Sequence, residues 1–154
     1  MIKLCNPRYW TCDMCGKEIS HSDFAAVYYC RHQVHPSMPL VGIAHTNSRN
    51  NSCIHRYARS GCSIADWSLS SLEGADGLMT LLEAIYARDW PSAPTHEVIK
   101  RLYVPHYEMA RFIIPTLPES SKEDFGIDGF WYQRDMVAAI KEMPPARRDH
   151  VSDI

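Results

Sequence analysis

The chain has 154 residues, of which 45% are hydrophobic and 22% charged, and its formal net charge is -2. This composition is typical of a globular protein with one domain, or of a small metal-supported module joined to a small helical one. The sequence has no run of 18 or more apolar residues and no apolar signal-peptide core at its start, so we expect a cytoplasmic protein without a membrane span.

Basic residues and cysteines are concentrated in residues 1–62. This part carries seven lysines and arginines against three acidic residues, a net charge of +4, whereas the other nine basic and fifteen acidic residues give -6. It also holds all six cysteines: Cys5, Cys12, Cys15, Cys30, Cys53 and Cys62. In a reducing compartment such clustering favours metal binding, and a secreted disulfide scaffold is the alternative.

The first recognisable element is the sequence Cys-Asp-Met-Cys-Gly at residues 12–16. Two cysteines on a tight turn direct both sulfurs at one ion, and Gly16 can adopt the positive φ that such a turn often needs. A redox dithiol would instead open a helix in a βαβ pattern, which does not surround this motif. The spacing therefore predicts a zinc knuckle in which Cys12 and Cys15 are two of four ligands.

A β-hairpin and a short helix are predicted after the knuckle. Residues 24–34 and residues 40–45 are rich in β-branched and aromatic side chains, and a proline-containing breaker separates these two predicted strands. After a polar loop, residues 53–61 predict a short helix that Gly61 ends. In the first strand we expect Cys30 to be a buried free thiol that packs as a small hydrophobe.

The second pair of ligands has more candidates than places: Cys30, His32, His35, His45, Cys53, His55 and Cys62. In a treble-clef-like arrangement the later ligands come from the end of a strand and the start of a helix. His45 ends the second predicted strand and Cys53 begins the short helix, so these two are the first choice. His55 and Cys62 are the replacements. An iron–sulfur cluster on four of the cysteines is an alternative, although the spacing matches no compact ferredoxin pattern.

From Asp66 onward the hydrophobic pattern becomes helical. The longest helix is predicted at about residues 72–89, with Ser70 or Ser71 as its N-cap. Four apolar residues at i, i+3, i+4 and i+7 define the face that we expect to pack into the core, namely Leu78, Leu81, Leu82 and Ile85.

Three further helices are predicted, at about residues 95–103 with Thr95 as cap, at 106–114, and at 134–143. Residues 115–126 between the last two read as a linker. The expected domains are thus a zinc-binding module at 1–62, a helical part at 63–143 and a disordered tail at 144–154. The predicted class is α+β, with a small treble-clef or zinc-ribbon-like module and its β-hairpin followed by a mostly helical part.

Several residues carry a resemblance to a protein family: Cys12, Cys15, Gly16, Trp67, Leu81, Leu82 and Trp90. Over roughly residues 10–99 the chain resembles small uncharacterised CxxCG zinc-knuckle proteins of actinobacteria and their phages. The resemblance implies an N-terminal CxxC, a later His and Cys, and a helix ending in Trp. In that group the later His and Cys are closely spaced, whereas seven residues separate His45 from Cys53. The group has no known function to carry over.

The sequence favours a small zinc-binding interaction or regulatory protein with a structural zinc. It contains neither HExxH nor the HxE and PCxxC pair of nucleotide deaminases, so we expect no catalytic activity. The expected partner is another protein or a second copy of the chain. We expect no binding to a membrane.

Two other functions stay open at this point. The first is a nucleic-acid-binding zinc module, in which arginines contact phosphates and a tyrosine stacks on a base, using Arg49, Arg56, Tyr57 and Arg59. The second is an HNH-like metal-dependent nuclease, suggested by histidines and asparagines ahead of Cys53-Ile54-His55. The paired histidines and the CxxCH motif of such nucleases are missing.

Overall fold

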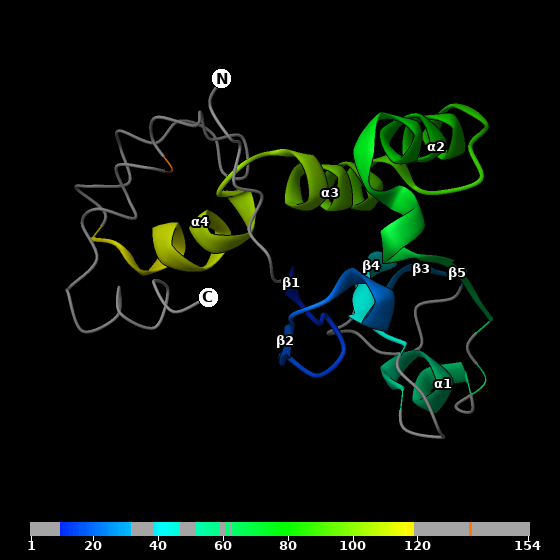
Figure 1. The fold of residues 1–154 in the computed structure, drawn as a ribbon, viewed down its shortest axis with the longest axis horizontal. Helices are drawn as coiled ribbons and strands as arrows, with labels where there is room; N and C mark the ends of the chain where they lie inside the picture. Colours follow the sequence, from blue (N-terminus) through cyan, green and yellow to red (C-terminus); the bar gives the residue numbers. More distant parts are fainter. Residues whose placement is uncertain are drawn as a thin grey trace. The chain divides into compact units, whose positions relative to one another are not determined.

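The computed structural model describes residues 10–31, 39–46, 52–58, 61, 63–118 and 136, except for the side chain of Tyr57. Its contacts divide the chain into two compact units, Tyr9–Tyr103 and a second unit made of Met1–Arg8 with Val104–Ile154. Each unit is described by itself (Figure 1). The first unit mixes strands and helices, which confirms the predicted α+β class. No helix in the described ranges is long and apolar enough to cross a membrane.

A short antiparallel pair of strands, β1 (Trp10–Thr11) and β2 (Glu18–Ile19), brackets the predicted knuckle. The Cys12 amide donates to the Lys17 carbonyl at 2.9 Å, and the Gly16 amide donates to the Cys12 carbonyl at 2.8 Å. Gly16 has a φ of 70°, in the left-handed region that glycine adopts without steric cost. The tight turn expected at residues 12–16 is therefore present.

The main sheet has three antiparallel strands in the order β4-β3-β5. The central strand β3 (Ala25–Cys30) pairs with β4 (Val41–His45) on one side and with β5 (Ile64–Ser68) on the other. Four consecutive residues of β3, Ala25–Tyr28, are buried, so both faces of this strand are covered. β3 and β4 confirm the predicted strand pair, whereas β5 overlaps the stretch where a helical pattern was expected.

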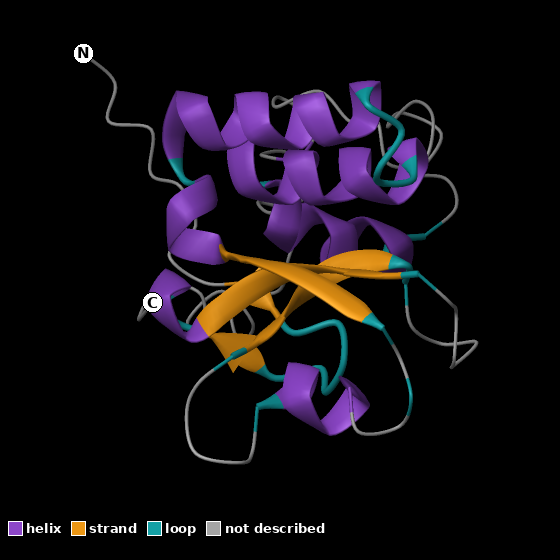
Figure 2. Cartoon of the chain, turned by 90° about the vertical axis from the view of Figure 1, so that its right-hand side faces the viewer, coloured by secondary structure: helices purple, strands orange, loops and turns teal. Residues whose placement is uncertain are grey.

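Two helices cover one side of the sheet and a third lies on the other side. In Figure 2, α2 (Gly74–Tyr86) and α3 (Ser92–Tyr103) lie above the sheet and α1 (Cys53–Ala58) lies below it. α3 packs against β4, and α2 packs against α3. Sheet and helices thus share one core.

Helix α2 packs into the core with a side that differs from the predicted one. Its buried residues are Gly77, Leu81 and Ala84, whereas Leu82 is 40% exposed. The prediction that Leu82 packs into the core is therefore wrong. A Cβ atom on Gly77 would overlap the carbonyl of Leu72. The side of α2 that carries Gly77 therefore lies directly against the backbone at Leu72.

The N-caps predicted for α2 and α3 are also wrong. Ser70 and Ser71 lie in a 3-10 turn that precedes α2, and α2 begins at Gly74 with a φ of 81°. Thr95 lies inside α3, where its hydroxyl donates to the carbonyl of Pro91 at 2.7 Å. A threonine that bonds to the carbonyl four residues earlier belongs to a helix interior and not to its start.

The second unit contains α4 (Tyr107–Ile113), which confirms the helix expected at residues 106–114. It is followed by a 3-10 turn at Ile114–Thr116, and their core consists of Tyr107, Ala110, Ile113, Ile114 and Met136. Met136 is helical and is the one described residue of the helix expected at 134–143. Residues 119–126 of the expected linker, and the expected tail at 144–154, lie outside the described residues.

Cys30 differs from its predicted state. It is buried and disulfide-bonded, whereas Cys12, Cys15 and Cys53 are free. The expectation of a free thiol at this position is therefore wrong. The clustered cysteines of the sequence serve more than one purpose, since one forms a disulfide and three others lie together as free thiols.

Candidate metal centre

Four potential ligands converge in the first unit: Cys12, Cys15, His45 and Cys53. One ligand atom from each, a cysteine sulfur or a histidine ring nitrogen, lies within 4.8 Å of all the others. The knuckle between β1 and β2 supplies two of them, the last residue of β4 supplies the histidine, and the first residue of α1 supplies the last cysteine. The structure thus brings together the four residues that the sequence ranked first. Such a set could hold a metal ion.

His45 is oriented by a hydrogen bond on the far side of its ring. Its Nε2 lies 3.1 Å from the Glu18 carbonyl, which can only accept, so Nε2 carries the proton. Nδ1 then has its lone pair free, and it lies 3.5 Å from the Cys15 sulfur and 3.8 Å from the Cys53 sulfur. A backbone carbonyl that fixes the tautomer in this way is a common support for a metal-binding histidine.

Asp13 connects the knuckle to the strand that carries His45. Its amide donates to the Ile43 carbonyl at 2.8 Å, and its carboxylate accepts from the Ile43 amide at 2.7 Å. These two bonds hold the knuckle against β4 two residues before His45. The local sequence Cys-Asp-Met-Cys therefore supplies both thiols and the contact that places them beside the histidine.

Ser52 positions the fourth member of the cluster. Its hydroxyl oxygen accepts from the His55 amide at 3.1 Å, and its side chain is buried. This is the geometry of an N-cap, which fixes the start of α1. Cys53 follows at the first helical position, where it lies beside the knuckle.

The three thiols differ in their environments. Burial raises the pKa of Cys12. Burial and the neighbouring Cys12 sulfur together raise the pKa of Cys53 to about 12. For Cys15, partial burial opposes ionisation. The Lys17 amide, hydrogen bonds from the other two thiols and the Lys17 charge outweigh it and lower the pKa. Two buried thiols therefore stay protonated unless a cation replaces their protons.

A buried arginine ties helix α3 to this site. Arg101 is 2% exposed, and it donates to the Asp13 carboxylate at 2.5 Å and to the Thr11 carbonyl at 2.7 Å. The sequence alone gives little sign that Arg101 belongs to this site, because 88 positions separate Arg101 from Asp13 and no motif links them. The signal in the sequence was weak: an arginine beside Leu102, on a helix whose apolar side faces the core.

The replacement ligands do not join the cluster within the described residues. His55 is exposed on α1, and Cys62 lies outside the described residues. Of the residues named for nucleic-acid binding, Arg56 is exposed in the last turn of α1. Arg49, Arg59 and the side chain of Tyr57 are not described, so that alternative stays a prediction.

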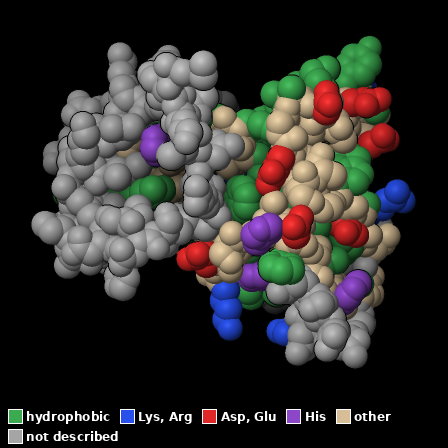
Figure 3. All heavy atoms as spheres, in the orientation of Figure 1, with side chains coloured by type: hydrophobic (Ala, Val, Ile, Leu, Met, Phe, Trp, Pro, Cys, Tyr) green, Lys and Arg blue, Asp and Glu red, His purple; other side chains and the backbone are tan. Residues whose placement is uncertain are grey.

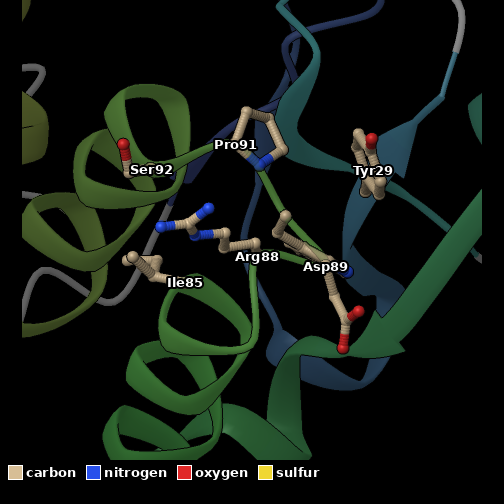
Figure 4. A pocket seen from close by; sticks show the side chains of 7 residues that line it. Tyr29, Ile85, Arg88, Asp89, Pro91 and Ser92 are labelled. Atoms are coloured by element: carbon tan, nitrogen blue, oxygen red, sulfur yellow. The ribbon is translucent and has the colours of Figure 1, made fainter.

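A separate pocket contains none of the four clustered residues. It lies where the loop after α2 meets α3 and β3, and its lining includes Tyr29, Arg88, Asp89 and Trp90. Figure 4 shows the Arg88 and Asp89 side chains pointing in different directions. Trp90 forms part of the core here, since it stacks on Trp67 with ring centroids 4.4 Å apart.

Comparisons of the chain with protein-family models, with curated proteins and with solved structures find no match.

Proposed function

We propose that the chain is a small zinc-binding protein whose metal is structural and which serves interaction or regulation. The observation that carries this proposal is the convergence of three thiols and one imidazole nitrogen from three separate segments. Thiolate and imidazole are the ligands that zinc prefers in structural sites. When bound, zinc would supply a fixed positive charge and four directed bonds.

The distances within the cluster suit zinc. In a tetrahedral site with Zn–S of about 2.3 Å and Zn–N of about 2.0–2.1 Å, a sulfur and a nitrogen lie about 3.5–3.6 Å apart. The His45 nitrogen lies 3.5 Å and 3.8 Å from two of the sulfurs. These values are close to the edges of such a tetrahedron.

Two features support a structural role over a catalytic one. Four protein ligands fill a tetrahedral zinc site, whereas catalytic zinc keeps one position for water or substrate. The Asp13 carboxylate, which lies between the two knuckle cysteines in the sequence, already accepts hydrogen bonds from Ile43 and Arg101 and forms part of the scaffold. The ligand sources, a knuckle, a strand end and a helix start, also suit a treble-clef-like module and the resemblance to CxxCG zinc-knuckle proteins.

The test is the metal content of purified protein, measured by elemental mass spectrometry without added metal. We expect about one zinc per chain, and its loss in Cys12→Ser, Cys53→Ser and His45→Ala. His55→Ala is the matched control, because this histidine is exposed on the same helix as Cys53 and should leave zinc content unchanged. Protein without zinc, or variants that all retain it, would contradict the proposal.

A further inference from the structure

Helix α2 exposes three large hydrophobic side chains on one stripe. Met79 is 62% exposed, Leu82 is 40% exposed and Tyr86 is 90% exposed. They follow one another at i, i+3 and i+7, and the exposed Ala75 precedes them by four residues. Isolated hydrophobic residues on a surface are ordinary, but an aligned set on one helix indicates a binding surface.

This stripe is distinct from the face that holds α2 in the fold. The buried residues of the helix, Gly77, Leu81 and Ala84, face the rest of the unit and already account for its packing. The spacing of the exposed residues is the alternating three and four of a coiled-coil seam. A seam of this kind fits the apolar stripe of another helix better than it fits a loop or a strand.

The charge beside the stripe is acidic. Helix α2 contains Asp76 and Glu83 and no lysine or arginine, and both acidic side chains are exposed. Within the described residues neither forms an ion pair. Figure 3 shows acidic side chains among hydrophobic ones over α2 on the face in view. Arg88 and Asp89, which follow the helix, contribute opposite charges.

We propose that the exposed stripe of α2 (Ala75, Met79, Leu82 and Tyr86) docks an amphipathic helix of another protein that carries lysine or arginine beside its apolar seam. This inference rests on the proposed function as an interaction protein and names the chemistry of its partner. A second copy of the chain fits less well, because an antiparallel pair of α2 helices would bring Asp76 and Glu83 of both copies together and a parallel pair would offer them no basic residue.

The probes are two synthetic three-heptad peptides with leucine at the a and d positions, one with lysine at e and g and the other with glutamate. Binding to the full, metal-loaded chain is measured by fluorescence anisotropy of labelled peptide. We expect the lysine peptide to bind at least about tenfold more tightly than the glutamate peptide. The double variant Asp76→Lys/Glu83→Lys should reverse this preference.

Variants within the stripe test its position. Met79→Ser and Tyr86→Ser should each weaken lysine-peptide binding by about tenfold or more, and their exposure means that the fold does not depend on them. Phe24→Ala is the matched control, since Phe24 is 50% exposed but lies outside α2, and it should bind like the wild type.

Three results would overturn the inference: equal affinity for the two peptides, no binding of either, or binding that Met79→Ser and Tyr86→Ser leave unchanged. A wild-type dimer in sedimentation equilibrium that Tyr86→Ser dissociates would identify a second copy as the occupant instead. Zinc content is measured on every sample. Failure to bind with one zinc per chain refutes the docking surface alone, and binding without zinc refutes the structural zinc alone.

Discussion

Arg101 is the residue through which the helical layer depends on the knuckle. Replacing it with methionine would remove the Arg101 charge from beside the Asp13 carboxylate, whose side chain is 9% exposed. We expect Arg101→Met to lower the free energy of unfolding by about 3–5 kcal/mol, since removing one member of a buried ion pair is costly. Chemical denaturation of the metal-loaded protein measures this change.

The neighbouring residue provides the control for Arg101. Lys100 pairs with Glu97 at 2.8 Å, but both side chains are more accessible to water. Lys100→Met should therefore change the free energy of unfolding by about 0–1 kcal/mol. Equal losses in the two variants would show that the Asp13–Arg101 pair has no special role.

The thiol pKa values predict how metal binding depends on pH. Burial raises the pKa of Cys12, and it raises that of Cys53 to about 12, so both are protonated at pH 7 in the metal-free protein. Metal binding needs thiolates and must release these protons, so affinity falls as pH falls. Each proton displaced changes the affinity about tenfold per pH unit.

Titration calorimetry in two buffers of different ionisation enthalpy counts these protons. We expect about two to three per metal ion at pH 7, because Cys12 and Cys53 each lose one and Cys15, whose pKa is lowered, loses at most one. Release of less than one proton would mean that Cys12 and Cys53 do not both bind the metal as thiolates.

At the level of elements, Gly77 fixes how α2 packs. Alanine is ordinarily the better helix former, by about 1 kcal/mol. At this position its Cβ would overlap the Leu72 carbonyl, so the backbone must shift. We expect Gly77→Ala to destabilise the protein by about 1–3 kcal/mol, measured by thermal unfolding. Thr80→Ala, on the same helix, should stay within about 0.5 kcal/mol, and a stabilising Gly77→Ala would contradict this packing.

The elements that the sequence predicted are those with a strong local signal. The strands around Val27 and Ile43 and the helices α2 to α4 follow hydrophobic patterns that depend on neighbouring residues only. β5 lacks such a pattern, because it is a short edge strand whose residues are mostly exposed and which depends on pairing with β3. The sequence did not show which side of α2 packs into the core. Apolar residues occupy more than half of the helix circumference, and the hydrophobic period alone does not select one side.

Some residues of the candidate site could likewise be predicted from the sequence, and others could not. Cys12 and Cys15 follow from a local motif, and His45 and Cys53 follow from their places at a strand end and a helix start. Arg101 does not, because its partner lies in a different element and only the folded chain brings them together. Long-range ion pairs carry no periodic signal in one sequence.

For the whole molecule, we expect the proposed zinc and the helical layer of the first unit to behave as one cooperative system. The knuckle holds Asp13 and Thr11 in reach of Arg101, and α3 in turn packs on β4. Removal of the metal by a chelator should lower the unfolding temperature by more than about 10 °C and weaken the helical circular dichroism. The experiment is done without reductant, so that the Cys30 disulfide is kept. An unchanged unfolding temperature would show that the fold does not depend on the metal.

X-ray absorption at the zinc edge of protein purified without added metal measures the proposed zinc coordination directly. We expect three sulfur ligands at about 2.3 Å and one nitrogen at about 2.0–2.1 Å, with no water bound to the zinc. In any zinc that His45→Ala still binds, the nitrogen signal at about 2.0–2.1 Å should be absent. A spectrum with only oxygen and nitrogen ligands, or with an iron or copper edge in place of zinc, would contradict a structural zinc held by Cys12, Cys15, His45 and Cys53.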